Sequence, residues 1–185
     1  AYRTPFVSGK DSLNNQFKAQ DGRVIEIPPT LLITGIGIVQ DVSRCITMDL
    51  KPVVGAPVLL VCSDGAGLKG TVAAAKFIAQ LIGDGLVLAA HDVSEGGPLV
   101  ALAEMLIAGS NSHRLGLAVD AARLPVEQQF QEQTGAYLLQ VRAADVGRVM
   151  ELASRIGGGD VSVLPDAAKT TDTGHLVLES AGQSV

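Results

Sequence analysis

The sequence predicts an α/β domain, in which strands and helices alternate along the chain. Hydrophobic residues make up 47% of the 185 residues and aromatic residues only 3%, so the core has to be built from Ala, Val, Ile and Leu, together with 21 glycines that favour tight turns. From residue 52 onward, short apolar runs typical of buried strands alternate with segments in which apolar residues recur three and four positions apart, as they do in helices. Periodicity alone therefore favours a parallel, doubly wound sheet.

The first fifty residues are the strand-rich part. We expect residues 5–8 and 24–50 to be extended, because β-branched residues are frequent from Leu31 to Val39 and Pro28-Pro29 prevents a helix just before them.

The alternating part begins with a strand at Val58 to Cys62 and an Ala-rich helix at Thr71 to Ile82, which ends at Gly83. A buried strand at Leu86 to Ala90 and a helix at 98–108 follow. Pro98 suits the first position of that helix and Gly109 favours a left-handed end. Its apolar stripe consists of Leu99, Leu102, Ala103 and Leu106.

Shorter elements are expected in the rest of the chain. They are a strand at 115–119, a short helix at 126–133 around a buried Phe130, a strand at 136–142, a helix at 144–156 that ends at three glycines, and two weak strands at 161–164 and 175–179. The polar composition of Asp166 to Gly174 predicts a mobile loop between these two strands.

Charge and composition exclude several classes of protein. The formal net charge is −5, which argues against a nucleic-acid or anionic-membrane surface, and no apolar run approaches the roughly 20 residues of a membrane span. The start, Ala1-Tyr2-Arg3, resembles neither a signal peptide nor a natural start, so we expect a piece of a longer protein. Cys45 and Cys62 lie in apolar runs without metal-binding spacing, which favours buried thiols in a reducing cytoplasm.

The first candidate site is the turn Gly9-Lys10-Asp11-Ser12, which follows a short strand. Lys10 is placed to meet a phosphate, although the turn is not a P-loop, because Thr4 stands where that motif needs glycine. The alternative is a polar hairpin turn with a solvated lysine.

The second candidate is His91-Asp92-Val93-Ser94-Glu95-Gly96-Gly97, between a buried strand and a helix N-terminus. A carboxylate and a hydroxyl two residues apart, beside two glycines that let a ligand approach the backbone, are suited to bind Mg²⁺ and polyphosphate together. The alternative is local capping, in which Asp92 or Ser94 accepts hydrogen bonds from the first helix N–H groups.

The third candidate is a GxGxxG pattern at Gly65, Gly67 and Gly70, between an expected strand and helix. Asp92 follows at about the distance of the ribose-binding acid in dinucleotide-binding domains, so this reading competes with the second. Asp41, at the end of an apolar run, is either a ligand or a turn residue.

Several segments together resemble phosphoribosylformylglycinamidine synthase. In chain order these are Pro5-Phe6-Val7-Ser8-Gly9-Lys10-Asp11-Ser12-Leu13-Asn14-Asn15, Pro28-Pro29-Thr30-Leu31-Leu32-Ile33, Asp41-Val42 with Met48-Asp49-Leu50-Lys51, and Ala90-His91-Asp92-Val93-Ser94-Glu95-Gly96-Gly97 with Ala101-Leu102-Ala103-Glu104-Met105. None is diagnostic alone, but four in the same order over residues 5–105 are specific. The resemblance implies the C-terminal part of a purine-biosynthesis ligase, which uses ATP to replace the formyl amide oxygen of formylglycinamide ribonucleotide with ammonia from glutamine.

The resemblance also implies a fold and a division into domains. Residues 1–50 would be the incomplete tail of an ATP-binding-type domain, and residues 51–185 a whole C-terminal domain of the aminoimidazole ribonucleotide synthetase kind. That domain is α+β, with three α/β/α layers, a mixed sheet and a partly ferredoxin-like arrangement. On this point the family expectation replaces the parallel sheet.

By the same resemblance, Lys10, Asp92, Ser94, Gly96 and Gly97 would bind ATP or ADP, and Asp41 and Asp92 would hold Mg²⁺. No residue of this chain is expected to be catalytic, so the isolated chain should be inactive. Its partners would be the N-terminal remainder of the synthetase, a glutaminase and a small purine-pathway substrate, in the cytoplasm.

One departure from the family lies at residues 63–70, where the family has a longer segment with a Leu-Gly-Gly-Ser turn. It puts in doubt any phosphate or substrate contact of that stretch. Two alternatives remain open, a dinucleotide-binding domain and a structural or interface module without a ligand.

Overall fold

Two units make up the chain, and they divide between Gln40 and Asp41. The computed structural model describes residues 3–10, 15–64, 68–109, 114–124, 128–180 and 183–184. In the smaller unit, β1 (Gln16–Lys18) and β2 (Val24–Glu26) form an antiparallel hairpin, whose turn contains Gly22 at a φ of 84°. The expected domain division at residue 50 refers to a longer protein and stays a prediction.

Residues 27–40 contain no strand, although their composition favours one. Their apolar side chains lie in solvent, with Leu32 90% exposed and Ile38 94% exposed. The Ile27 N–H donates to the Asn15 carbonyl at 3.4 Å, and for the described residues 28–40 no backbone hydrogen bond to a strand is present. These residues, for which an extended conformation is expected, therefore do not pair as a strand of any sheet.

We expect the amides of Leu31 to Val39 to exchange with solvent quickly in a monomeric sample, because nothing in the unit protects them. Hydrogen exchange followed by mass spectrometry measures this. Slow exchange in a sample shown to be monomeric by light scattering would contradict the prediction, whereas slow exchange in a dimer would indicate pairing between two copies.

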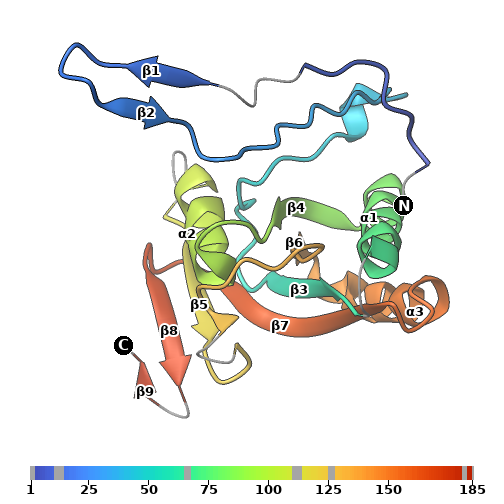
Figure 1. The fold of residues 1–185 in the computed structure, drawn as a ribbon. Helices are drawn as coiled ribbons and strands as arrows, with labels where there is room; N and C mark the ends of the chain where they lie inside the picture. The colour runs from blue at the N-terminus through green and yellow to red at the C-terminus, as the bar shows by residue number, and fades with distance from the viewer. Residues whose placement is uncertain are drawn as a thin grey trace. The chain divides into compact units, whose positions relative to one another are not determined.

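The larger unit is built on a seven-stranded mixed sheet in the order β4-β6-β3-β7-β5-β8-β9 (Figure 1). The strands are β3 (Pro57–Ser63), β4 (Val87–Asp92), β5 (Gly116–Asp120), β6 (Tyr137–Val141), β7 (Val161–Thr171), β8 (Leu176–Ser180) and β9 (Gln183–Ser184). All neighbouring pairs are antiparallel except β5 and β8, which are parallel. The parallel sheet that periodicity favours is therefore wrong, and the mixed sheet of the family expectation is confirmed.

Four of these strands have ferredoxin-like topology. One βαβ unit runs from β3 through α1 (Leu68–Gly83) to β4, and a second runs from β6 through α3 (Val146–Ile156) to β7. Because α1 leaves space for one strand between β3 and β4, β6 pairs there antiparallel to both. Periodicity indicates where a strand lies in the sequence but not which strands pair with it, and this explains why it favours a parallel sheet here.

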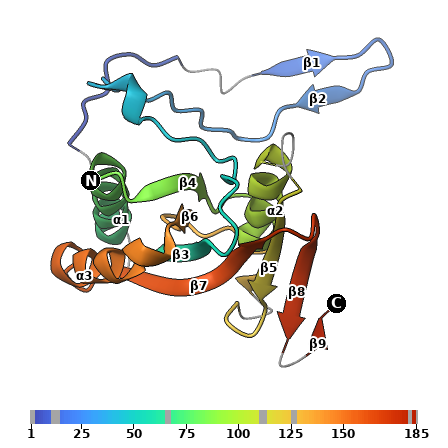
Figure 2. The same cartoon turned by 180° about the vertical axis from the view of Figure 1, so that it is seen from behind.

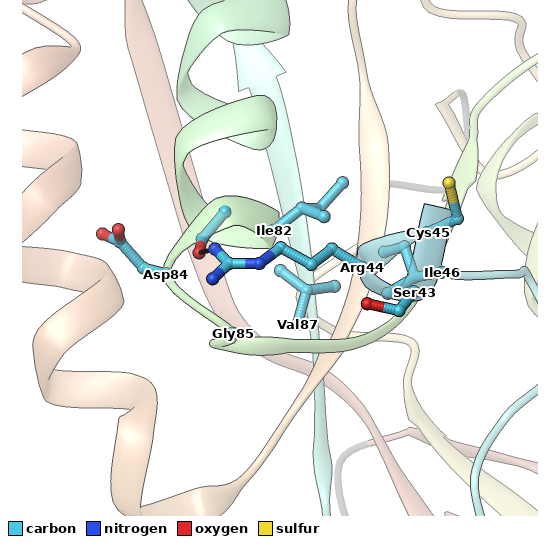
Figure 3. Close-up of a pocket in the computed structure, with 9 residues that line it drawn as sticks. Ser43, Arg44, Cys45, Ile46, Ile82, Asp84, Gly85 and Val87 are labelled. Atoms are coloured by element: carbon cyan, nitrogen blue, oxygen red, sulfur yellow. Dashed lines mark hydrogen bonds between the residues drawn. The ribbon is translucent and has the colours of Figure 1, made fainter. Parts of the chain in front are cut away.

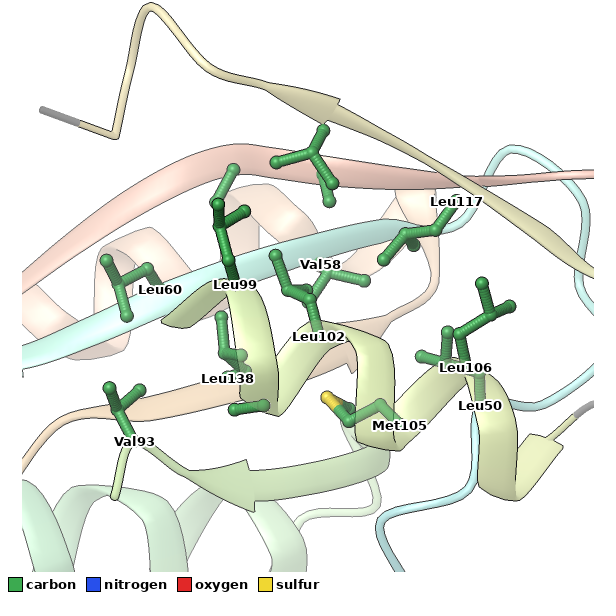
Figure 4. Close-up of a cluster of buried hydrophobic side chains, with 14 of the residues drawn as sticks. Leu50, Val58, Leu60, Val93, Leu99, Leu102, Met105, Leu106, Leu117 and Leu138 are labelled. Atoms are coloured by element: carbon green, nitrogen blue, oxygen red, sulfur yellow. The ribbon is translucent and has the colours of Figure 1, made fainter. Parts of the chain in front are cut away.

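Helices cover both faces of the sheet and give three layers. Residues alternate along β3, so that Val58 and Leu60 face α2 (Gly97–Gly109), and Leu59 and Val61 face α1 and α3. Figures 1 and 2 show α1 and α3 side by side and α2 apart from them. Figure 4 shows the core under α2, in which Leu102 and Met105 are fully buried.

Two expectations about loops and helices are wrong. Residues 166–171 are not a loop but the second half of β7, because Ala167, Ala168 and Thr170 are buried against the core and residues 168–171 pair with β3, β5 or both. The helix expected at 126–133 is absent from its described part, residues 128–133, which contains turns and a single 3-10 residue. Residues 125–127 lie outside the described residues.

Other expected elements are confirmed with shifted ends. A 3-10 helix, η1 (Val42–Arg44), precedes the sheet and another, η3 (Ala143–Asp145), leads into α3.

Cys45 is exposed rather than buried, and Cys62 is half-buried, with burial raising the pKa of its thiol to about 11. Among the described helices, none has the length and apolar character that crossing a bilayer requires.

The buried side chain of Gln140 on β6 fastens the segment before β3 to the sheet. Its Oε1 accepts a hydrogen bond from the Lys51 N–H at 2.7 Å, and its Nε2 donates to the Lys51 carbonyl at 2.9 Å. Residues before β3 therefore belong physically to the larger unit, as the burial of Leu50 also indicates.

We expect Gln140→Leu to lower the free energy of unfolding by roughly 2–4 kcal/mol, because both backbone groups of Lys51 lose their partner. Urea denaturation followed by circular dichroism measures the change. Gln80→Leu is the matched control on exposed helix surface, and we expect it to change stability by no more than about 0.5 kcal/mol. Similar losses for the two variants would refute this role of Gln140.

Candidate functional site

The segment His91 to Gly97 joins the end of β4 to the start of α2 at one edge of the sheet. Pairing with β6 ends at Asp92, which lies opposite Tyr137. The Val93 N–H then donates to the Ala136 carbonyl at 3.0 Å, which fixes the point where the chain leaves the sheet. The polar side chains of this segment are therefore held by a rigid strand on one side and a packed helix on the other.

A chain of hydrogen-bonding side chains runs through this site. The Ser94 hydroxyl donates to Asp92 Oδ2, and Asp92 Oδ1 lies 3.1 Å from His91 Nδ1. The other ring nitrogen, His91 Nε2, lies 3.1 Å from Glu104 Oε2 on α2. The His91 side chain is only 16% exposed, whereas that of Asp92 is 61% exposed, so the chain presents one oriented carboxylate to solvent.

The electrostatics keep Asp92 ionised. The hydrogen bond from Ser94 is the main cause that holds the pKa of the Asp92 carboxyl below its ordinary value; burial opposes it, and the hydrogen bond with His91 lowers the pKa to a lesser extent. An ionised, accessible carboxylate beside a hydroxyl suits a hard cation, since Mg²⁺ is commonly bound by one or two carboxylates together with substrate phosphates. The residues present therefore fit Mg²⁺ with a nucleotide, with Asp92 and Ser94 as the groups that would hold it.

The structure argues against the capping alternative, because N–H groups at the start of α2 donate to backbone carbonyl groups. The Leu99 N–H of α2 donates to the Gln129 carbonyl at 3.2 Å, and the Gly97 N–H donates to the Ser94 carbonyl at 3.0 Å. Among the residues that the structure describes, no N–H group of α2 donates to the side chain of Asp92 or Ser94. Asp92 is therefore not needed to begin the helix.

The backbone conformation explains why the segment contains two glycines. Gly96 and Gly97 have φ values of 84° and 70°, in the left-handed region. A Cβ on Gly97 would lie 2.6 Å from the backbone of Gln131, and one on Gly96 would lie 2.5 Å from the Val100 side chain. Close packing alone accounts for both glycines, and their expected role in nucleotide binding stays a prediction.

Asp41 is engaged in local contacts. Its Oδ1 accepts hydrogen bonds from the Ser43 N–H at 3.0 Å and the Ser43 hydroxyl at 2.6 Å, and its Oδ2 lies 3.5 Å from Arg44 Nε. The hydrogen bonds from Ser43 lower the pKa of its carboxyl. Asp41 caps η1, which agrees with a turn residue, and its role as a Mg²⁺ ligand stays a prediction.

Lys10 belongs to the smaller unit, and its expected contact with a phosphate stays a prediction. Within the part of the chain that the structure describes, no three or more His, Cys, Asp or Glu side chains gather as a metal site would require. Any cation at Asp92 would therefore depend on ligands from outside this group, such as phosphate oxygens.

The sheet argues against the dinucleotide-binding alternative. That motif needs the acidic residue at the end of the strand adjacent to the glycine turn, but β6 separates β3 from β4 here. A Cβ on Gly70 would lie 2.7 Å from the Asp64 carbonyl oxygen, so packing explains this glycine. Gly65 and Gly67 lie outside the described residues.

Sequence reasoning missed Glu104 and misplaced Phe130. Glu104 is the single charged residue of α2, which is the signal that could have identified it. Phe130 is 65% exposed rather than buried, because the neighbouring Gln129 is the buried side chain, with its Nε2 donating to the Leu124 carbonyl at 2.8 Å.

A pocket of about 370 Å³ lies at the turn between α1 and β4 (Figure 3). The Arg44 side chain crosses it and donates to the Gly83 carbonyl at 2.8 Å. The pocket is lined by Ser43, Arg44, Cys45, Ile46, Ile82, Gly83, Asp84, Gly85 and Val87. None of the expected site residues lines it, so it is separate from the site at Asp92.

Comparison with known proteins gives a consistent set of relatives. Residues 66–175 match the family described as AIR synthase related protein, C-terminal domain. The chain is 32% identical over 193 residues to the phosphoribosylformylglycinamidine synthase subunit PurL of Zymomonas mobilis, which covers 86% of this chain and 26% of that protein. It is 35% identical over 201 residues to the same subunit of a Bradyrhizobium species, covering 97% and 26% respectively. The chain thus spans about a quarter of the length of the curated relatives that it matches.

Solved structures support the fold. Phosphoribosylformylglycinamidine synthase II from Thermotoga maritima has a TM-score of 0.63 at 16% identity, over 78% of this chain and 27% of that one. A thiamine-monophosphate kinase from Stenotrophomonas maltophilia has a TM-score of 0.52 at 13% identity, over 77% and 54%. Since enzymes of different activity share the fold, the fold alone does not identify the reaction.

Proposed function

We propose that this chain, which belongs to the family of the AIR synthase related protein, C-terminal domain, is the C-terminal part of an ATP-dependent phosphoribosylformylglycinamidine synthase. The observation that carries the proposal is the identity of 32–35% with PurL subunits over most of this chain. The whole protein would convert formylglycinamide ribonucleotide and glutamine-derived ammonia into formylglycinamidine ribonucleotide in cytoplasmic purine biosynthesis.

Within that protein, the domain beginning near residue 51 would bind a nucleotide at the end of β4. Structures of the Thermotoga maritima PurL have been solved as complexes with ATP and with ADP, which supports a nucleotide as a ligand. Asp92 would hold Mg²⁺, which neutralises phosphate oxygens that would otherwise repel the carboxylate, and the neighbouring Ser94 would bind the nucleotide. Lys10 would add a positive charge and Asp41 a second carboxylate.

The residues of this chain would bind and orient rather than react. None of them is proposed to be catalytic, and residues 1–50 would be the end of an ATP-binding-type domain that the rest of the synthetase completes. A structure of PurLQS from Thermotoga maritima supports an assembly with further components, and we propose that a glutaminase among the partners of the synthetase supplies the ammonia.

Thermal-shift measurements on the 185-residue chain test the class of ligand. We expect ADP with Mg²⁺ to raise the melting temperature and NAD(H) to leave it unchanged, because a ligand stabilises only the folded state that binds it. A shift with NAD(H) alone would favour the dinucleotide-binding alternative. No shift with any nucleotide would favour an interface module.

A turnover assay tests the proposed division of labour. We expect the purified chain to release no ADP from ATP in the presence of formylglycinamide ribonucleotide and ammonia, because the catalytic residues would lie in the rest of the synthetase. ADP release above a metal-free blank would show that this chain contains catalytic residues.

A further inference from the structure

We infer that Glu104 is a positioning residue for Asp92, acting through the imidazole of His91. The inference rests on the proposed function, because it assigns Asp92 to the nucleotide and its Mg²⁺. It goes beyond that proposal in naming a helix residue that would not touch the ligand.

Glu104 is placed by a rigid helix. Its neighbours along α2, Leu102 and Met105, are fully buried in the core under the helix (Figure 4), so the backbone at Glu104 cannot shift without disturbing that core. The carboxylate nevertheless stays near the surface, with a side chain that is 51% exposed. The helix α2 thus has a single acidic residue, and that residue lies beside His91.

His91 connects this acid to Asp92. Its two ring nitrogens lie 3.1 Å from Glu104 Oε2 and 3.1 Å from Asp92 Oδ1, so the ring has a carboxylate on each side. A doubly protonated imidazole donates to both carboxylates at once, and a neutral one donates to either. In both cases the contact with Glu104 restricts rotation of the ring.

The restricted ring in turn orients Asp92. His91 contacts Oδ1 and the Ser94 hydroxyl donates to Oδ2, so both oxygens of the carboxylate have a fixed neighbour while the side chain stays exposed. Partners of this kind behind a metal ligand typically change metal affinity about 10–100-fold when they are removed. Without Glu104 the ring would turn, and Asp92 would have to be ordered when the ligand binds.

The experiment compares Glu104→Ala with Glu104→Gln in the full synthetase, by calorimetric titration with ADP and Mg²⁺. We expect Glu104→Ala to lower the Mg²⁺-dependent affinity about 10-fold or more. Glu104→Gln should stay within about 3-fold of wild type, because its amide oxygen still accepts a hydrogen bond from the ring. Glu151→Gln is the control, since Glu151 on α3 forms an ion pair with Arg148 and lies on the opposite face of the sheet.

A nuclear magnetic resonance measurement reports on the geometry without any ligand. In the ¹⁵N-labelled 185-residue chain, we expect slow solvent exchange of the proton on His91 Nε2, and loss of its signal in Glu104→Ala but not in Glu151→Gln. A role limited to stability would lower the melting temperature and leave Glu104→Gln no better than Glu104→Ala.

The outcomes separate this inference from the proposed function. If Asp92→Asn abolishes binding and Glu104→Ala binds like wild type, Glu104 does not position Asp92. If Asp92→Asn itself binds like wild type, the proposed nucleotide site fails, and the inference about Glu104 fails with it.

Discussion

Replacing Asp92 by Asn should abolish Mg²⁺-dependent ADP binding by the full synthetase. The substitution removes the negative charge that a Mg²⁺ ligand needs but keeps one oxygen for the hydrogen bonds with Ser94 or His91. The free energy of unfolding should therefore fall by no more than about 1 kcal/mol. Calorimetric titration of ADP with and without Mg²⁺, together with urea denaturation, measures both effects.

The control for this variant is Asp84→Asn, which makes the same chemical change in the turn before β4, where the carboxylate accepts a hydrogen bond from Gln80. Its affinity for ADP should equal that of wild type. Equal affinities of Asp92→Asn and wild type would contradict the proposed site. In the 185-residue chain we expect weaker binding throughout, because Lys10 would lie in a domain that the rest of the synthetase completes.

Gly97→Ala should be strongly destabilising, to an extent comparable with Gln140→Leu. A side chain at a φ of 70° costs about 1–2 kcal/mol, and the added Cβ would lie 2.6 Å from backbone atoms of Phe130 and Gln131, which adds roughly 1–3 kcal/mol. We expect the free energy of unfolding to fall by roughly 2–5 kcal/mol in urea denaturation.

Gly147→Ala on α3 is its counterpart, since the space around Gly147 is open and the residue is helical. It should raise stability by roughly 0.5–1 kcal/mol, because alanine restricts the unfolded chain and favours helix. Equal stabilities of the two variants would contradict the prediction that close packing between Gly97 and residues 129–131 excludes a side chain at this position.

The sequence predicted individual elements better than their arrangement. The helix at 98–108 was located within one residue at each end, because Pro98, Gly109 and the spacing of leucines are local signals. The position of β6 between β3 and β4 depends on contacts between residues some eighty positions apart, such as Leu59 and Leu139, and no local pattern encodes it. The family resemblance supplied the mixed sheet instead.

The candidate site was predicted in part, for a similar reason. Asp92 and Ser94 follow an apolar strand directly, so their proximity could be inferred from spacing. Glu104 reaches the same site because α2 folds back over β4. A single acidic residue in an apolar helix does not indicate, from the sequence alone, which other residues it contacts. The polar residues 166–171 misled because only Lys169 is exposed, whereas Ala167, Ala168 and Thr170 are buried and Asp166 and Thr171 are partly buried.

The pairing of β3 with β7 has a consequence for how the protein is made. The backbone of Ala56 is joined to the side chain of Thr170, 114 positions later, so the centre of the sheet stays open until almost the whole domain has left the ribosome. At about 5–20 residues per second, β3 would wait roughly 6–23 seconds for this partner. During that interval its fully apolar run Val58 to Val61 is available to other nascent chains. Yield on overexpression should therefore depend on chaperone capacity more than on the stability of the finished fold.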